Sequence, residues 1–452
     1  MTNAELLAHL RHQLQPCRKA GRWVLGFSGG LDSTVLLDLV HALQKTLPDT
    51  PPVLALHIHH GLSPHADSWA AHCRAQCAVR GVPVEVLPVQ VDSTAGRSVE
   101  EAARESRYQA FASRLAPGDV LLLAHHADDQ AETLLLRALR GAGPVGLGAM
   151  AARRAMAAGR LLRPLLDVPR AALLAWARGH GLAWIDDESN ADARFDRNYL
   201  RLEVLPRLAA RWPGYLDTLG RTARWQRESA GLLVELAEQD AARAVDACGR
   251  LSVAALLALS APRQRNLLRH WLATLALPMP SEAQLAQIQA AALAAEDAQP
   301  RVHWGGAEVR RHRGLLYAMR ALPAWLAPPA RTWRLPDGLQ ASPGAAAGAV
   351  LDLADAGRLE AWPTTGAGLR AGLGPLTLQF RQGGERCRPA GRAHSQRLKK
   401  LLQDADLEPW LRDRVPLLYC RDELVAVGDL WVCEGWQAGP GERGWQLVWS
   451  RP

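Results

Sequence analysis

The sequence predicts an α/β protein, with a parallel sheet wrapped by helices, a mostly helical middle domain and a small α+β C-terminal domain. Short apolar runs alternate with helical patterns up to about residue 212, as expected for a parallel sheet covered on both faces. Residues 213–300 are dominated by Ala, Leu, Arg and Glu at helical spacing, and strand-like segments follow. A chain of 452 residues also exceeds one core, because domains usually hold about 100–200 residues.

Four strand candidates define the first domain, at residues 22–27, 53–58, 84–91 and 120–124. The last reads Val-Leu-Leu-Leu-Ala, which is typical of a strand buried on both faces. Helical spacing predicts helices at residues 33–47, 65–80, 99–114 and 128–140. A glycine-rich stretch then ends the last helix, and a further α/β segment with a helix from about Arg170 completes the domain.

We expect three domains, at residues 1–212, 213–325 and 332–452. Residues 302–319 have the pattern of a hairpin that closes the middle domain, and the Pro- and Ala-rich residues 321–330 suit a linker. In the C-terminal domain, strands are expected at 376–381, 417–419 and 424–430, around one helix near 395–404.

Positive charge is concentrated in one segment of the chain. The net charge is +8 and the sequence pI is about 9.4. Residues 381–400 carry seven basic residues against the single acid Glu385: Arg381, Arg386, Arg388, Arg392, Arg397, Lys399 and Lys400. This concentration predicts a surface that binds the phosphates of a polyanion.

Targeting features are missing from the sequence. No apolar run approaches the roughly 20 residues of a spanning helix, and the start lacks the basic region, apolar core and cleavage site of a signal peptide. The seven cysteines are scattered and include no Cys-x-x-Cys, which favours reduced thiols over a disulfide framework. We therefore expect a cytoplasmic protein that has no membrane partner.

The sharpest pattern is Ser28-Gly29-Gly30-Leu31-Asp32-Ser33, between the first strand and the next helix. An open parallel sheet binds ligands here, past the carboxyl end of a strand. The glycines let successive amides face an anion, and the serine hydroxyls and the helix N-terminus add favourable dipoles. No Gly-Lys-Ser/Thr follows, so this is not a Walker loop, and the glycine order does not fit the dinucleotide pattern. The six residues predict a phosphate-binding loop.

A second polar cluster, His125-His126-Ala127-Asp128-Asp129-Gln130-Ala131-Glu132-Thr133, follows the fourth strand. Because it starts at a carboxyl strand end, we expect it beside the phosphate loop. Asp129 and Glu132 share a helix face, and such a pair suits a magnesium–phosphate complex or the ammonium group of a substrate. Asp128 suits a helix cap, and His125 suits a phosphate contact or proton transfer.

A third polar stretch, residues 184–201, carries acids and ends in Arg194, Arg197 and Arg201, with two aromatic residues, Phe195 and Tyr199, between these arginines. Arginines with aromatics suit contact with phosphate and base together. A salt-bridged surface loop that leads into a helix is the alternative.

In order along the chain, these segments resemble the tRNA(Ile)-lysidine synthetase family, whose catalytic domain is a PP-loop (N-type) ATP pyrophosphatase. Ser-Gly-Gly-x-Asp-Ser resembles that superfamily's pyrophosphate-binding loop. The other matching stretches lie at residues 59–62, 101–108, 125–133, 140–144, 163–166, 187–201, 391–395, 398–402 and 410–414. The resemblance covers nearly all of residues 20–212 and about 380–435, whereas the middle domain matches in kind only. One departure is Ser63-Pro64, where the family more often has Arg-Pro.

The resemblance implies a Rossmann-like PP-loop fold and an enzyme that uses ATP and Mg²⁺. The substrate would be the isoleucine tRNA with a CAU anticodon. O2 of its wobble cytidine would attack the α-phosphate of ATP, and the ε-amine of L-lysine would then displace AMP. The product is lysidine, which changes the codon read from AUG to AUA.

Within that reaction, the chemistry of the individual side chains suggests their roles. Residues 28–33 would hold the phosphates of ATP, with Mg²⁺ at Asp32. Asp32, Arg104 and His125 would act in catalysis, with Arg104 at the α-phosphate. Asp129 and Glu132 would bind lysine. The expected tRNA-binding residues are Arg194, Arg197, Arg201, Arg386, Arg388, Arg392, Arg397, Lys399 and Lys400.

Two other interpretations remain open. The chain could be another PP-loop enzyme, such as a tRNA thiolase, although those enzymes use cysteine pairs or clusters and no Cys-x-x-Cys is present. It could also be an RNA-binding protein with an inactive nucleotide site, although the loop is intact. His57, His59 and His60 could be taken for a metal site, but the resemblance places that strand end beside adenosine. A homodimer is also possible.

Overall fold

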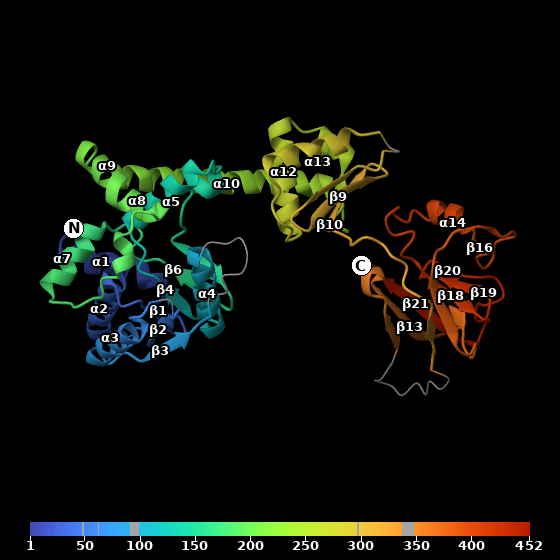
Figure 1. The fold of residues 1–452 in the computed structure, drawn as a ribbon, viewed down its shortest axis with the longest axis horizontal. Helices are drawn as coiled ribbons and strands as arrows, with labels where there is room; N and C mark the ends of the chain where they lie inside the picture. The colour runs from blue at the N-terminus through green and yellow to red at the C-terminus, as the bar shows by residue number, and fades with distance from the viewer. Residues whose placement is uncertain (48, 62, 91–98, 296–297, 337–347) are drawn as a thin grey trace. The chain divides into compact units, whose positions relative to one another are not determined.

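The computed structural model describes residues 1–47, 49–61, 63–90, 99–295, 298–336 and 348–452 (Figure 1). The chain forms two compact units, Met1–Leu233 and Val234–Pro452. Within the described ranges, no helix is both long and apolar enough to cross a membrane.

The first unit is built on a six-stranded sheet with the order β3-β2-β1-β4-β6-β5. Its strands are β1 (Trp23–Gly26), β2 (Val53–His59), β3 (Val84–Pro88), β4 (Val120–Leu122), β5 (Arg153–Met156) and β6 (Gly159–Leu162). β1, β2, β3, β4 and β6 are parallel, whereas β5 pairs with β6 in the antiparallel direction. The four predicted strands are confirmed; residue 91, the predicted end of the third, lies outside the described residues.

Helices connect these strands much as predicted. They are α1 (Asn3–Leu14), α2 (Leu31–Thr46), α3 (Ala66–Val79), α4 (Val99–Arg114), α5 (Ala127–Leu139), α6 (Pro144–Leu147), α7 (Arg170–Gly179), α8 (Asp196–Tyr199) and α9 (Leu205–Arg211). A π-helical turn, Leu200–Val204, joins α8 to α9, and α10 (Tyr215–Ala244) runs into the second unit.

Alternating side chains give the sheet two buried faces. Trp23, Leu25 and Phe27 pack with buried residues of α1, α2, α3 and α7. Val24 faces the other way and packs in a separate cluster with Phe111 of α4. Successive side chains of a strand point to opposite faces, so a strand that is apolar throughout requires helices on both sides. The carboxyl ends of β1, β4 and β6 therefore lie along one edge between these layers.

The second unit holds two separate clusters of buried apolar residues. One involves β7 (Leu251–Ser252), α11 (Val253–Leu257), α12 (Ala261–Thr274), α13 (Glu282–Leu293), β8 (Arg301–Trp304), β9 (Ala307–His312) and β10 (Leu315–Arg320). The predicted hairpin at 302–319 is a three-stranded meander, because β9 pairs with both β8 and β10.

The other cluster belongs to residues 333–449. It includes one helix, α14 (Leu398–Asp404), and the strands β11 (Arg331–Trp333), β12 (Ala349–Asp352), β13 (Arg358–Thr365), β14 (Leu369–Arg370), β15 (Leu376–Phe380), β16 (Arg386–Cys387), β17 (Gln396–Arg397), β18 (Pro416–Cys420), β19 (Glu423–Val427), β20 (Trp431–Val432) and β21 (Arg443–Ser450). The predicted strands correspond to β15, β18 and β19, and the predicted helix to α14. The long pair β13 and β21 was not predicted.

Candidate active site

The phosphate loop is held in shape by its own hydroxyl groups. Ser33 Oγ donates to the Gly30 carbonyl (3.1 Å), and it accepts from the Ser28 backbone N–H (3.3 Å). The Ser28 and Ser33 hydroxyls also lie 3.0 Å apart, and Ser28 Oγ accepts from the Gly30 N–H. Ser33 is buried, whereas Ser28 is exposed. The loop is therefore rigid at its base and open at Ser28.

Gly29 has a conformation and surroundings that only glycine fits. Its φ is +82°, and a Cβ would lie 2.7 Å from Cδ1 of Ile185 and 2.9 Å from Sγ of Cys73. The Ile185 N–H also donates to the Gly29 carbonyl (2.9 Å). The segment that enters the third polar stretch thus packs directly against the phosphate loop.

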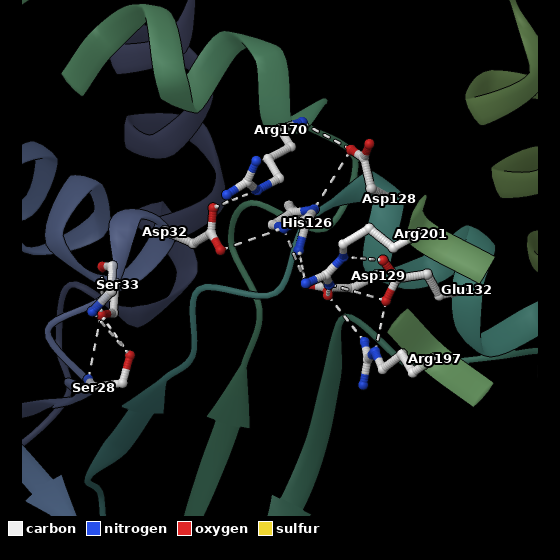
Figure 2. Close-up of polar contacts among 11 residues, drawn as sticks. Ser28, Asp32, Ser33, His126, Asp128, Asp129, Glu132, Arg170, Arg197 and Arg201 are labelled. Carbon is white, nitrogen blue, oxygen red and sulfur yellow. Dashed lines mark hydrogen bonds and ion pairs between the residues drawn. The ribbon is translucent and has the colours of Figure 1, made fainter. Parts of the chain in front are cut away.

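His126 lies at the centre of three carboxylates, shown in Figure 2. Its Nε2 is 3.5 Å from Asp32 Oδ2 and 3.5 Å from Asp129 Oδ2, and its Nδ1 is 3.5 Å from Asp128 Oδ2. The His126 side chain is 1% exposed. Burial disfavours a charged ring, but Asp129, Asp128 and Asp32 outweigh it and raise the pKa of His126 to about 10. The ring is an imidazolium at neutral pH.

The pKa values of the neighbouring carboxyl groups shift in the opposite direction. Burial raises the pKa of Asp129, but the charges of His126 and Arg197 outweigh it and lower that pKa to about 2. The pKa of Asp128 is also lowered, since His126 and the Arg170 backbone N–H overcome burial. Asp128 Oδ2 accepts from that N–H at 2.8 Å, so the residue predicted to cap its own helix bonds to the start of α7.

Two predicted tRNA-binding arginines pair with the two carboxylates predicted to bind lysine (Figure 2). Arg197 donates to Glu132 Oε2 (2.6 Å) and Asp129 Oδ1 (2.9 Å). Arg201 donates to both oxygens of Glu132, at 2.7 Å to Oε1 and 3.1 Å to Oε2. Glu132 is fully buried. Arg194 instead pairs with the half-buried Asp192 at 2.6 Å, and its own side chain is 89% exposed.

His125 faces a different set of residues from its neighbour. Arg163 Nε donates to His125 Nδ1 (3.3 Å), so this nitrogen is unprotonated and Nε2 carries the hydrogen. Burial, together with Arg163, Arg197 and Arg104, lowers the pKa of His125 to about 3 despite Asp129. His125 is therefore a neutral ring. Arg104 is exposed on α4, with its guanidinium 5.1 Å from the Tyr108 ring centroid.

A cavity of about 340 Å³ opens beside the acidic cluster, within the first unit. Asp128, Glu132, Arg170 and Arg201 supply its charged lining, and Leu174 and Leu205 contribute apolar surface. It thus offers carboxylates, guanidinium groups and an aliphatic wall. Asp129 does not line it.

The three histidines at the end of β2 have separate partners. His57 Nδ1 lies 3.0 Å from the Phe27 carbonyl, His59 Nε2 lies 3.0 Å from Asp67, and Arg107 Nε donates to His60. Among the described residues, no group of three or more His, Cys, Asp or Glu could hold a metal ion.

The basic C-terminal residues gather on one hairpin and the helix that follows. Arg386 of β16 pairs with Arg397 of β17, and α14 begins at the next residue. The Arg386 guanidinium donates to the Ser395 carbonyl, and that of Arg388 donates to the Arg392 carbonyl. The exposed residues, here called the basic hairpin, are Arg386, Arg388, Arg392, Arg397, Lys399 and Lys400.

Sequence reasoning missed His126, Arg163 and Arg170 as members of this site. The double histidine gave no sign of which ring would turn inward. Arg170 was recognised only as a helix start, and Arg163 only as part of a matching stretch. The signal for Arg163 was its place directly after a buried strand, which sets it at the sheet edge that carries the other site residues.

Family models match three parts of the chain. A PP-loop domain model matches residues 3–208. A model described as the TilS substrate binding domain matches residues 251–317, and one described as the TilS substrate C-terminal domain matches residues 376–449.

Whole-chain relatives agree with these matches. A tRNA(Ile)-lysidine synthase of Serratia proteamaculans is 42% identical, with all of both chains covered. One of Coxiella burnetii is 42% identical over 95% of this chain and 93% of its own, and one of Alkalilimnicola ehrlichii is 45% identical over 94% and 93%. With this identity along its whole length, the chain belongs to the tRNA(Ile)-lysidine synthase family.

Proposed function

We propose that this chain couples L-lysine to C2 of the wobble cytidine of the isoleucine tRNA with a CAU anticodon, using ATP and an adenylated cytidine intermediate. The observation that carries the proposal is the cavity lined by Asp128 and Glu132, which lies beside the phosphate loop and the carboxylates around His126. One edge of the sheet thus combines an anion-binding loop with carboxylates that can bind the ammonium group of a substrate. The family supports the same assignment.

The phosphates of ATP are assigned to residues 28–33. Asp32 Oδ1 is buried and has no hydrogen-bond partner among the described residues, so it fits Mg²⁺, which commonly binds one or two carboxylates plus substrate phosphates. When bound there, Mg²⁺ would neutralise charge on the departing pyrophosphate. Arg170 Nε lies 3.9 Å from the same oxygen and adds positive charge.

Adenylation requires an oxygen of the base to reach the α-phosphate while negative charge develops there. O2 of cytidine attacks phosphorus, and the bond to the β-phosphate oxygen breaks as pyrophosphate leaves. His125 can donate a hydrogen bond from Nε2 to a phosphoryl oxygen, but it holds no transferable proton at neutral pH because its pKa is about 3. Arg104, exposed at the same edge, is assigned to the developing charge.

Lysine is assigned to the cavity beside Glu132. Its lining matches the chemistry of the amino acid, since Asp128 and Glu132 suit the ε-ammonium group, Arg170 suits the α-carboxylate, and Leu174 and Leu205 suit the aliphatic stem. Glu132 already accepts from two arginines, but a carboxylate has about four lone-pair sites. The ε-ammonium group must lose a proton before it attacks, since only the neutral amine has a lone pair. A second proton leaves the nitrogen as the C2–N bond forms and the C2–O bond to AMP breaks. Asp128 is assigned to hold the nitrogen during these steps, and both protons pass to water. Asp129 then orients Arg197 and His126.

The tRNA body is assigned to the basic hairpin, because its six basic side chains are exposed and phosphate contacts dominate RNA affinity. Arg197 and Arg201 are directed to carboxylates, so their part in tRNA binding would be indirect, through the shape of the site.

Labelled-lysine incorporation into unmodified isoleucine tRNA, with ATP and Mg²⁺, tests this function. Incorporation is expected for the native chain, and its loss is expected for Asp32→Ala but not for Asp67→Ala, an exposed carboxylate of α3. Pyrophosphate release that depends on tRNA but leaves lysine unincorporated would refute the lysine assignment. Incorporation that survives in Asp32→Ala would refute the role of the loop.

A further inference from the structure

Tyr108 of α4 gathers three arginines that take no part in the acidic cluster. The guanidinium carbons of Arg104 and Arg154 lie 5.1 Å and 5.2 Å from the centroid of its ring. Arg163 Nη2 donates to the Tyr108 hydroxyl (3.2 Å). Tyr108 itself packs edge-to-face on Phe111, a buried core residue, with an interplanar angle of 87°. The phenol ring is thus an anchored platform for positive groups.

The topology explains how these residues meet. Arg163 directly follows β6, at the carboxyl edge of the sheet. β5 runs antiparallel to β6, with Arg154 opposite Leu161, so the start of β5 lies at the same edge. His125, which follows β4, accepts from Arg163 and links the group to the active site.

Within the part of the chain that the structure describes, acids do not compensate the positive charge of this group. Among the described side chains, no carboxylate forms an ion pair with Arg104, Arg154 or Arg163. Arg163 is 5% exposed, and burial, with repulsion from Arg154 and Arg104, lowers its pKa despite Tyr108. Arg197 and Arg201, by contrast, are matched by Asp129 and Glu132. Like charges held together with no ion-pair partner among the described side chains create a site that an anion would stabilise.

Arg154 is the member of the group that can reach a ligand. The three side-chain nitrogens of Arg163 already donate hydrogen bonds to His125, Ala151 and Tyr108. Arg154 is exposed, and within the described ranges its guanidinium has only the ring of Tyr108 as a partner.

We infer that Arg154, positioned by Tyr108 and backed by Arg163, binds a backbone phosphate of the RNA next to the nucleotide that is modified. The inference rests on the proposed function for the identity of the RNA. The phosphates of ATP belong to the loop after β1, and β5 lies three strands further along the sheet, roughly 14 Å at the usual strand spacing. A second phosphate site at that distance suits a polynucleotide. Its target base would then lie at the carboxyl edge of the sheet, between the phosphate loop and Arg154.

Arg153 provides a matched control on the same strand. It carries the same charge and is also exposed, but neighbouring side chains of a strand point to opposite faces. Its guanidinium donates to the Gln13 carbonyl at 3.4 Å, away from Tyr108. Arg154→Ala and Arg153→Ala therefore change the net charge equally and differ in position.

The experiment measures tRNA affinity at several salt concentrations, without ATP or lysine, for the full-length chain and both variants. Arg154→Ala should weaken binding several-fold and reduce the slope of log affinity against log salt by about 1. Arg154→Lys should retain most of that slope, and Arg153→Ala should match the native chain. Equal effects of the two alanine variants, or no effect of Arg154→Ala, would overturn the inference.

Two further measurements separate this site from other roles. Binding of ATP alone should be unchanged in Arg154→Ala, and its loss would assign the group to the nucleotide instead of the RNA. Tyr108→Phe keeps the ring that positions Arg154 and should bind tRNA as the native chain does. In the double variant, Tyr108→Ala should weaken tRNA binding little further than Arg154→Ala alone. If lysine were never incorporated while Arg154→Ala still lost affinity selectively, the proposed function would fail and the RNA phosphate site would stand.

Discussion

Gly29 controls the shape of the phosphate loop through its backbone and through the space around it. Gly29→Ala would place a Cβ against Ile185 and Cys73 and would force a left-handed conformation on alanine. The strain is worth about 1–2 kcal/mol, and the overpacking adds roughly 1–3 kcal/mol. Gly81→Ala is the control, because its φ is +63° but no atom lies within 4 Å of the added Cβ.

Chemical denaturation of both variants separates the two costs. We expect Gly29→Ala to lose clearly more unfolding free energy than Gly81→Ala, and to lose tRNA-dependent pyrophosphate release. Equal losses of stability would mean that the loop can move away from α3 and Ile185.

His126 makes stability depend on pH in the alkaline range. Its pKa is raised from 6.5 to about 10 in the folded chain, so the folded state keeps a proton that the unfolded state releases. The stabilisation is fully present below about pH 6.5 and declines as the pH rises through about 10. We expect the melting temperature of the native chain to fall more steeply than that of His126→Gln across this range.

The acid limb follows the opposite rule. The pKa of Asp129 is lowered from 3.8 to about 2, so its contribution is present above about pH 3.8 and is lost as the pH falls towards 2.

For the alkaline prediction, the decisive comparison is the dependence of melting temperature on pH. If the melting temperatures of the native chain and of His126→Gln fell equally between pH 6.5 and 10, the His126 ring would not be charged in the folded state.

At the scale of elements, α14 uses different side chains to pack on its core and to present positive charge. Leu398, Leu401 and Leu402 of α14 are buried, and Lys399 and Lys400 between them are exposed. The alternation fixes the helix on its core while it presents two ammonium groups to solvent.

The four lysines of the chain offer a balanced test of this element. Replacing Lys399 and Lys400 by alanine should weaken tRNA binding and lower the salt slope by about 2, since each phosphate contact contributes about 1. Replacing Lys19 and Lys45, which are exposed in the first unit, removes the same charge and should have little effect. Filter binding across salt concentrations measures both pairs, and similar slopes for the two would argue against a localised site.

At the scale of the whole molecule, local patterns predicted the catalytic fold well. The phosphate loop, the four parallel strands and α4 follow from short-range signals: apolar runs, helical spacing and a glycine turn. These signals are complete within about 20 residues, so tertiary contacts did not need to be known. The resemblance to a family added the functional context.

Long-range pairings are the part that the sequence could not supply. Arg197 and Glu132 are 65 residues apart, and Arg201 and Glu132 are 69 apart. Each looked free for a ligand of opposite charge, and the fold brings them together. β13 and β21 were not predicted for a similar reason. Pro363 interrupts β13, and the residues of β21 that pair with it come 78 to 92 positions later.

The antiparallel strand β5 also has a consequence for solubility. It is the last strand of the sheet, and two of its four residues, Arg153 and Arg154, are exposed arginines. An unprotected edge strand invites strands of other molecules to add to the sheet, and short, charged edges prevent this. Arg154, which is inferred to bind RNA, and Arg153, which is not, would thus both help to prevent self-association. A chain that loses both arginines would gain a tendency to aggregate.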